Sequence, residues 1–290
     1  MKPQDTRLLI SVVVPTRDRP DLLRRCLDRL APGAQTLDAA RYEVVVSDDG
    51  APGSAATALA ATHPWARTVE GPRRGPAANR NAGAKAARGE WLAFTDDDTV
   101  PSPAWLASFV AALAPGADVY EGRTTCEGGF GSPLWHAPVN ETGGKLWSCN
   151  FLVRAATFER VGGFDERFRH PHMEDQDLRI RLASLGPIRF VRDAVVDHPP
   201  RRQSSGARLG AYRESEVRFM YKHGAPRPVA AALLRTIVRY RLGVIRSTPR
   251  SLDTIGAFWS LARELAYVRG HVASWERASA AEFPPPSGGA

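Results

Sequence analysis

The sequence has few cysteines and no long apolar run, and each absence excludes a class of protein. Cys26, Cys126 and Cys149 are scattered along the 290 residues and lack the spacing of a metal site. This pattern predicts reduced thiols rather than a disulfide framework. No apolar stretch approaches the ~20 residues that a transmembrane helix requires. The polar segment 1–7 has no signal-peptide pattern. We therefore expect a cytoplasmic protein, with peripheral contact at the inner face of the membrane left open.

Acidic residues are scarce only in the C-terminal part of the chain. Residues 201–290 hold 15 Lys and Arg against 6 Asp and Glu, whereas residues 1–200 hold 24 against 25. The net charge of +8 therefore comes from the C-terminal part. A basic segment of this kind can contact phosphates, nucleic acid or an anionic membrane. Overall, 43% hydrophobic and 24% charged residues are ordinary for a globular protein, and the length suits one large α/β domain with an appendage.

Three consecutive carboxylates, Asp96, Asp97 and Asp98, follow the apolar run 91–94. The run is short and aromatic-rich, which predicts a buried strand, so the acids are expected at the carboxyl edge of a sheet. Open α/β sheets bind ligands at that edge. Three like charges this close repel unless a cation compensates them, and hard oxygen ligands suit Mg²⁺ or Mn²⁺. Taken alone, the triplet also fits a solvated acidic turn.

Strands and helices alternate along the first 200 residues, which predicts a mostly parallel sheet with right-handed crossovers. Strands are predicted at 8–14, 42–47, 91–94, 119–123, 148–153, 188–191 and 194–196. Helices are predicted from an Asp18 cap to Pro32, at 54–61, 103–113 and 155–161, from 174 onward, and where the loop at 75–86 opens into a helix.

Other polar groups stand at element ends in this part of the chain. Asp48 and Asp49 end the second strand, and Asn79, Arg80 and Asn81 offer donors near a helix start, where anions are favoured. The small residues around them also suit a helix packed tightly on the sheet, and this interpretation is favoured when the segment is taken alone.

Two further features each have a functional and a structural interpretation. Glu174 and Asp175 begin a helix, where the helix dipole alone stabilises acids, and His198 precedes a double proline, which is typical of a turn. The irregular stretch 127–147 is long enough to be functional. Its Trp135 and Trp147 either stack on a substrate or pack in the core.

Beyond residue 201, helices are predicted at 206–223, 229–246 and 252–269. The second is amphipathic, with an apolar face of Leu234, Val238, Leu242 and Ile245 and a separate stripe of Arg235, Arg239 and Arg246. Such a helix lies on a membrane surface or packs on the catalytic domain or a partner chain, and packing is favoured. The domains expected are 1–204 for catalysis, 205–283 for the basic helices and 284–290 for a disordered tail.

Six ordered sequence blocks resemble the family-2 glycosyltransferases with the GT-A fold. The blocks are 11–19, 46–50, 75–83 with 89–91, 94–98, 150–154 with 161–166, and 173–179. The resemblance covers about residues 8–200 and implies a Rossmann-like, mostly parallel sheet flanked by helices, here with a C-terminal helical extension.

The resemblance also implies roles for individual residues. The nucleotide sugar would contact the main chain around Pro15, Thr16 and Arg17, together with Asp49, Asn81, Asp96 and Asp97. Asp98 would bind a divalent metal, Mn²⁺ or Mg²⁺, most directly, with Asp96 and His198 as further ligands. Asp175, beside Glu174, would be the general base.

The implied activity is a metal-dependent, inverting transfer of a sugar from a nucleoside-diphosphate sugar to an acceptor hydroxyl. A UDP-sugar is the commonest donor in such families, and the acceptor is a glycan, a lipid-linked sugar or a small molecule. A nucleotidyltransferase is an alternative, although the segment 15–19 lacks the glycines it would need. A non-catalytic sugar-nucleotide-binding scaffold is another, although every acid of the motif is present. Nucleic-acid binding is not expected, and a homo-oligomer stays open.

Overall fold

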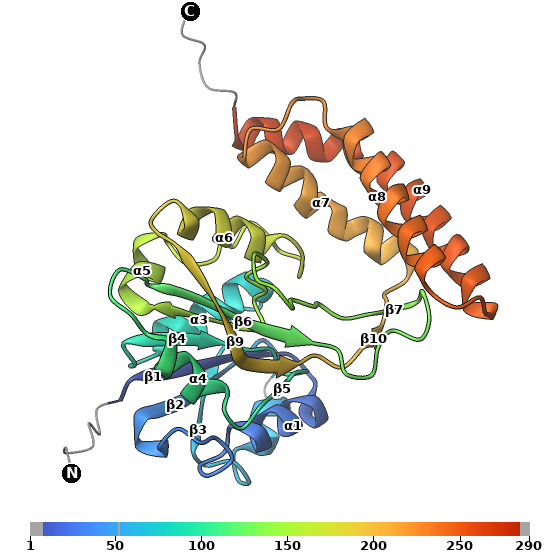
Figure 1. The fold of residues 1–290 in the computed structure, drawn as a ribbon. Coiled ribbons are helices and arrows are strands. Elements are labelled where there is room, and N and C mark those ends of the chain that lie inside the picture. The colour runs from blue at the N-terminus through green and yellow to red at the C-terminus, as the bar shows by residue number, and fades with distance from the viewer. Residues whose placement is uncertain (1–7, 52, 285–290) are drawn as a thin grey trace, which may run out of the picture. The chain divides into compact units, whose positions relative to one another are not determined.

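The structure is a computed structural model that describes residues 8–51 and 53–284. It divides into two compact units, each shown in Figure 1. The described parts of the first unit run to Glu127 and continue as Pro138–Arg169 and Glu174–Pro199. Those of the second are Gly128–Ala137, His170–Met173 and the chain from Pro200 onward. The division at 204/205 stays a prediction, and residues 285–290 of the predicted disordered tail lie outside the described residues.

The first unit is built on one mixed sheet, in which eight of the described strands pair in the order β3-β2-β1-β4-β8-β6-β9-β5. The strands are β1 (Ile10–Thr16), β2 (Tyr42–Asp48), β3 (Ala66–Glu70), β4 (Trp91–Phe94), β5 (Val100–Pro101), β6 (Val119–Thr125), β8 (Phe151–Arg154) and β9 (Ile188–Asp197). Pairing is parallel within β3-β2-β1-β4 and between β6 and β9, and antiparallel at β8 and β5. The mostly parallel α/β sheet predicted from the sequence is confirmed.

Helices cover both faces of the sheet (Figure 1). They are α1 (Pro20–Leu30), α2 (Ala55–Leu59), α3 (Pro76–Ala86), α4 (Trp105–Ala112), α5 (Ala155–Arg160) and α6 (Glu174–Ala183), and a short 3-10 turn spans Ala39–Arg41. Side chains alternate along β1, so that Val12 and Val14 pack with α1 and α4, whereas Val13 packs with α3, α5 and α6. Two apolar cores therefore fix the sheet from both sides.

The second unit is a group of three helices with a core of its own. They are α7 (Gly206–Lys222), α8 (Ala230–Ser247) and α9 (Leu252–Glu282), and two short strands, β7 (Trp135–His136) and β10 (Arg201–Arg202), pair in the same unit. Val217, Leu233, Ile237, Leu261 and Val268 are buried between the helices. No helix of the described residues has the length and apolarity needed to cross a bilayer.

Several local predictions are wrong for identifiable reasons. The two closing strands are one strand, β9, because a bulge opposite Gly122 and Arg123 lets the chain pass through the non-alternating segment between them. Asp18 does not cap α1; it has φ +53°, and the cap residue is Arg19 without a side-chain bond.

The apolar face of α8 is centred one position from the predicted one. Its buried residues are Leu233, Ile237, Arg241 and Ile245, and the predicted Leu234 and Leu242 are partly buried against the same core. The reason is that Arg241 is buried against Glu264 and Gln203, a pairing that the apolar pattern cannot reveal. The arginines of the predicted stripe are exposed.

Helix α3 packs so closely on the sheet that Gly83 cannot carry a side chain without displacement. A Cβ there would lie 2.6 Å from Cγ1 of Val13. We expect Gly83→Ala to lower the free energy of unfolding by about 1–3 kcal/mol, the usual cost of overpacking. Gly270→Ala is the control, since that helical position faces open space and Ala is the better helix former. Denaturant titrations followed by circular dichroism test this, and a wild-type midpoint for Gly83→Ala would contradict it.

Candidate active site

Four strands of the first unit end at the same edge of the sheet. β1, β2 and β4 are mutually aligned, and β9 points the same way because β8 reverses the direction once and β6 reverses it again. Their carboxyl ends bring together Thr16, Asp48, the loop after Phe94 and His198. This edge is where α/β sheets of this kind bind ligands. The topology therefore joins residues that are up to 182 positions apart in the sequence.

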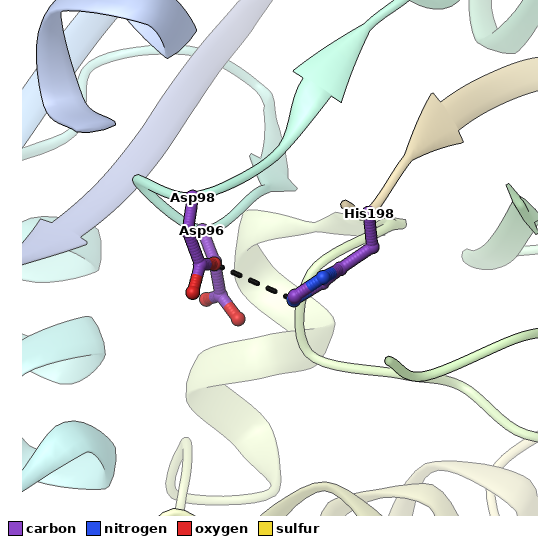
Figure 2. Close-up of side chains that lie close together, drawn as sticks. All are labelled: Asp96, Asp98 and His198. Carbon is purple, nitrogen blue, oxygen red and sulfur yellow. Dashed lines mark ion pairs between the residues drawn. The ribbon is translucent and has the colours of Figure 1, made fainter. Parts of the chain in front are cut away.

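Asp96, Asp98 and His198 form a cluster at that edge (Figure 2). One ligand atom from each lies within 4.8 Å of the others, and His198 Nε2 is 3.4 Å from Asp98 Oδ1. The other ring nitrogen, Nδ1, is 3.1 Å from the carbonyl oxygen of Pro199, to which it can only donate. In the neutral ring the lone pair of Nε2 then faces the carboxylates, which is the usual orientation of a metal-binding histidine. The donor set fits a divalent cation.

Asp97 points the other way and is fully buried. Its carboxylate accepts a hydrogen bond from Thr16 Oγ1 at 2.6 Å and is 2.5 Å from Arg19 Nη2. Burial raises the pKa of Asp97 to about 7, against the opposing effect of the Arg19 charge. The side chain expected to face ribose or diphosphate therefore ties the acidic loop to the end of β1.

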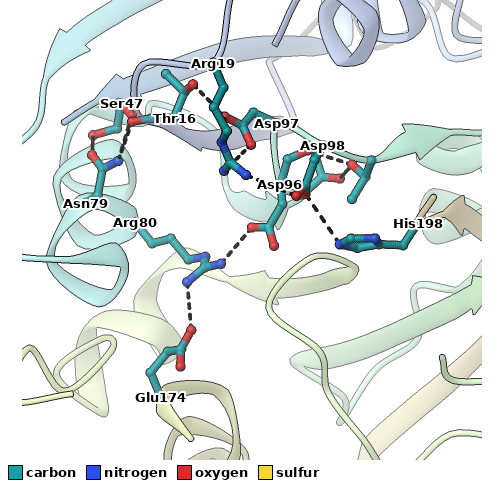
Figure 3. Close-up of polar contacts among 12 residues, drawn as sticks. Thr16, Arg19, Ser47, Asn79, Arg80, Asp96, Asp97, Asp98, Glu174 and His198 are labelled. Carbon is teal, nitrogen blue, oxygen red and sulfur yellow. Dashed lines mark hydrogen bonds and ion pairs between the residues drawn. The ribbon is translucent and has the colours of Figure 1, made fainter. Parts of the chain in front are cut away.

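Two arginines compensate the acids, as Figure 3 shows. Arg19 spans Asp97 and Asp98, with Nη1 3.1 Å from Asp98 Oδ2. Arg80 is 4% exposed and joins Asp96 (2.7 Å) to Glu174 (3.1 Å). Arg19 and Arg80 thus offset part of the repulsion between the three carboxylates.

Glu174 and Asp175 begin α6, directly after Met173, a non-glycine residue with φ +70°. Asp175 is 9% exposed, and its Oδ1 accepts a hydrogen bond from the backbone NH of Gln176 at 2.7 Å. Burial raises the pKa of Asp175 to about 6, although the nearby charge of Arg80 favours the ionised form. A carboxyl group with such a pKa is suited to accept a proton near neutrality.

Asp48 and Asp49, the acidic pair predicted at the end of the second strand, make different contacts. Asp48 accepts hydrogen bonds from Gly50, Ser54 and Ala56, so it shapes the turn into α2. Asp49 is buried and accepts from the backbone NH of Arg73 at 2.9 Å, and burial raises its pKa.

Close by, the main chain of Thr16 accepts from Asp49 N and Asn79 Nδ2. Pro15 is buried within β1, whereas Arg17 extends into solvent with 74% of its side chain exposed. The carbonyl and hydroxyl groups of Thr16 are thus already hydrogen-bonded within the protein. Arg17 is the exposed residue of the segment 15–17.

Asn81, which is expected to contact the nucleotide sugar, bonds to the turn that follows α5. Its amide donates to Phe164 O at 2.8 Å and to Glu166 at 3.1 Å, and its oxygen accepts from Phe164 N at 2.9 Å. Both donor hydrogens of the amide are therefore used within the protein, and its contact with the nucleotide sugar stays a prediction.

Sequence reasoning did not place Arg19 at this site, and it identified Asn79 and Arg80 only as donors near a helix start. Arg19 carried a usable signal, because it follows the first strand at the same sheet edge as the acids. The Arg80 bridge carried none, since its partners are 16 and 94 residues away. Cys149 is also close to these charges, but it is buried and its pKa is raised well above the usual thiol range. It is therefore neutral and a poor nucleophile.

The mixed sheet with acids at its carboxyl edge is the arrangement of a glycosyltransferase with the GT-A fold. Residues 11–173 match glycosyl transferase family 2, and the chain belongs to that family. The resemblance stated from the sequence blocks is confirmed.

Curated relatives include two bacterial proteins. The chain is 29% identical to validoxylamine A glucosyltransferase of Streptomyces hygroscopicus subsp. jinggangensis, over 74% of this chain and 61% of that protein. It is 31% identical to the O-antigen biosynthesis protein RfbC of Myxococcus xanthus, over 73% of this chain and 19% of that protein. The chain thus spans less than two thirds of the length of these relatives.

Solved structures share the fold at low identity. The mannosyltransferase PcManGT of Pyrobaculum calidifontis, in complex with GDP-Man and Mn²⁺, is 20% identical with a TM-score of 0.55, over 97% of this chain and 88% of that one. Residues 1–349 of S. aureus TarS, in complex with UDP-GlcNAc, are 16% identical with a TM-score of 0.56, over 94% and 89% of the two chains.

Removal of Arg80 should leave two acids without their shared buried partner. We expect Arg80→Ala to lower the free energy of unfolding by about 3 kcal/mol, the cost of breaking a buried ion pair. Arg25→Ala, at an exposed position of α1, is the control and should change the free energy of unfolding by less than about 0.5 kcal/mol. Urea titrations of both variants provide the measurement. Equal stabilities would show that the bridge does not hold the site together.

Proposed function

We propose that the chain is a metal-dependent, inverting glycosyltransferase that uses a nucleoside-diphosphate sugar as its donor. The observation that carries the proposal is the cluster of Asp96, Asp98 and His198, joined through Arg80 to the helix that begins with Glu174 and Asp175. Family membership supports the sugar transfer. The metal, the direct displacement and the residue roles are our inferences from the site.

Asp98, Asp96 and His198 would hold the metal. Two carboxylates with one imidazole suit Mn²⁺ better than Mg²⁺, which prefers an all-oxygen shell. When bound, a divalent ion neutralises charge on the diphosphate leaving group. Arg19 already faces Asp98 and would add positive charge on the same side. Asp96 is held in position by Arg80.

Asp175 would act as the general base. The acceptor hydroxyl gives its proton to the Asp175 carboxylate while its oxygen forms a bond to the anomeric carbon. The bond from that carbon to the diphosphate oxygen breaks, and the nucleoside diphosphate leaves with the electron pair. Attack from the face opposite the leaving group inverts the anomeric configuration. Glu174, fixed by Arg80, would hold the beginning of α6 in register with the metal cluster.

Asp49, at the end of β2, and Arg17, extending from the end of β1, would contact the nucleotide. Two fold neighbours were solved with GDP-Man and with UDP-GlcNAc. A UDP-sugar is our first choice of donor, and a glycan, lipid-linked sugar or small molecule is the acceptor class.

Residues 1–204 would carry the chemistry, and 205–283 would form a basic helical part. We further propose that the protein is cytoplasmic and lies at the inner face of a membrane.

The general base can be tested by removing its charge while retaining its shape. Asp175→Asn should lower kcat by about 10²–10⁴-fold, the typical contribution of a positioned base, and should leave nucleotide affinity within about twofold. Steady-state kinetics and isothermal titration with UDP measure the two effects. Asp177→Asn in the same helix is a useful comparison, because that acid pairs with Arg181 instead. Near-normal turnover of Asp175→Asn would refute the assignment.

The raised pKa of Asp175 predicts a distinctive pH profile. The base works only when deprotonated, so kcat/KM should fall about tenfold per pH unit below about pH 6 and level off above it. An Asp with its ordinary pKa would hold activity to about pH 4. Burial also raises the pKa of Asp97, to about 7. The Asp97→Asn variant distinguishes the two acids, because its kcat/KM should still fall below about pH 6. A limb near pH 4 would contradict the proposed role.

A further inference from the structure

Helix α9 exposes a second apolar face in addition to the one in its core. Leu261, Val268 and Val272 are buried against the other helices of the unit. On the solvent side, the first two turns carry four large hydrophobic residues that we call the α9 stripe. They are Leu252, Ile255, Phe258 and Trp259, with 87%, 60%, 50% and 69% of their surface exposed.

The spacing places these residues together. Leu252, Ile255 and Trp259 are three and four positions apart, so they lie along one line of the helix, and Phe258 is next to Trp259. Single exposed hydrophobic residues are normal, but a contiguous apolar face on a soluble unit marks an interaction site.

Arginines surround the stripe. Arg250 lies two residues before α9, Arg246 lies in the last turn of α8, and Arg263 is one turn beyond Trp259 on the same line of the helix. All three are exposed, as are Arg235 and Arg239 on α8. From residue 229 to residue 263 the sequence has one carboxylate, Asp253. Asp253 accepts a hydrogen bond from Ser132 at 2.6 Å. The exposed charge of this helical hairpin is therefore positive.

The bond to Asp253 also brings other exposed rings to this end of the second unit. Ser132 belongs to the segment that carries Phe130 and Trp135, which are 38% and 39% exposed. Its neighbour Leu134 lies next to Gly256 of α9, 3.2 Å from the position that a Cβ would take there. Apolar and aromatic residues from two segments thus gather at the beginning of α9.

We propose that the α9 stripe and its arginines bind the surface of a bilayer that contains anionic lipids. Trp, Phe, Leu and Ile with a fringe of arginine are the residues of an interfacial helix, which buries its apolar face at the headgroup boundary. Each arginine near an anionic leaflet adds to the attraction. The contact is peripheral, because no described helix could span the membrane.

Charge complementarity favours a bilayer over two other occupants. A symmetric contact with a second copy would place the same surface on both sides and bring the two sets of arginines together. Nucleic acid would use the arginines, but it offers no apolar partner for Leu252 and Ile255, and single strands stack on aromatic rings. Of these three occupants, the anionic bilayer matches both the charge and the aliphatic side chains.

Sedimentation of the full chain with vesicles tests the proposal independently of catalysis. Binding is expected to vesicles of equal parts phosphatidylcholine and phosphatidylglycerol, to weaken in high salt, and to be absent with phosphatidylcholine alone. Ile255→Ser with Trp259→Ser should reduce the partition coefficient at least tenfold, since both lose apolar contact with the bilayer. Arg246→Glu with Arg250→Glu should do the same through charge.

Matched controls use residues outside the second unit. Leu185→Ser removes an exposed hydrophobic residue, and Arg189→Glu with Arg192→Glu reverses two exposed charges on β9. Both should bind vesicles like the unmodified chain, and circular dichroism should show native helix in all variants. The proposal fails if the chain ignores anionic vesicles, or if stripe and control variants bind equally. It also fails if light scattering shows a dimer that the stripe variant abolishes while vesicle binding is unchanged.

Discussion

The balance of charge at the carboxyl edge of the sheet is the constraint on which the site depends. Three consecutive acids cannot stay ionised side by side without nearby positive charge. Arg19 and Arg80 provide part of it from opposite sides, and the geometry of Asp96, Asp98 and His198 leaves room for a divalent cation to provide the rest. Because Arg80 also holds Glu174, the same ion pairs connect the cluster of Asp96, Asp98 and His198 to the helix of the proposed base.

The fold makes this balance possible by routing distant segments to one place. The acids follow β4 and Arg19 follows β1. Helix α3 packs on the sheet, and its Arg80 contacts both Asp96 and Glu174. β9 then returns the chain so that His198 faces the carboxylates (Figure 3). The acids and His198 follow the ends of strands, Arg19 directly precedes α1, and Arg80 reaches the cluster from within α3. The proposed sugar transfer needs such a rigid edge, because the leaving group and the acceptor must be aligned at one carbon atom.

Much of the fold could be predicted from the sequence, because apolar runs bounded by Gly and Pro define the strands of a buried sheet. The acidic triplet and the Glu174-Asp175 pair were found for the same reason, since strand and helix ends are local features. The Arg80 bridge, the inward orientation of Asp97 and the framework role of Asn81 were not. Each depends on which partner the tertiary fold supplies, and Asn81 in particular is bonded to Phe164, 83 residues away. The strand at Ala66–Glu70 was missed because it is largely polar and only partly buried.

Nucleotide binding with and without metal tests the central claim most directly. Thermal unfolding should be measured with UDP, GDP, dTDP, CDP and ADP, each with Mn²⁺ and with EDTA, for the unmodified chain and for Asp98→Ala. The account predicts a higher unfolding temperature with one nucleotide and Mn²⁺, and loss of that increase both in EDTA and in Asp98→Ala. An equal increase in EDTA, or in Asp98→Ala, would contradict a metal-bridged donor site at this edge of the sheet.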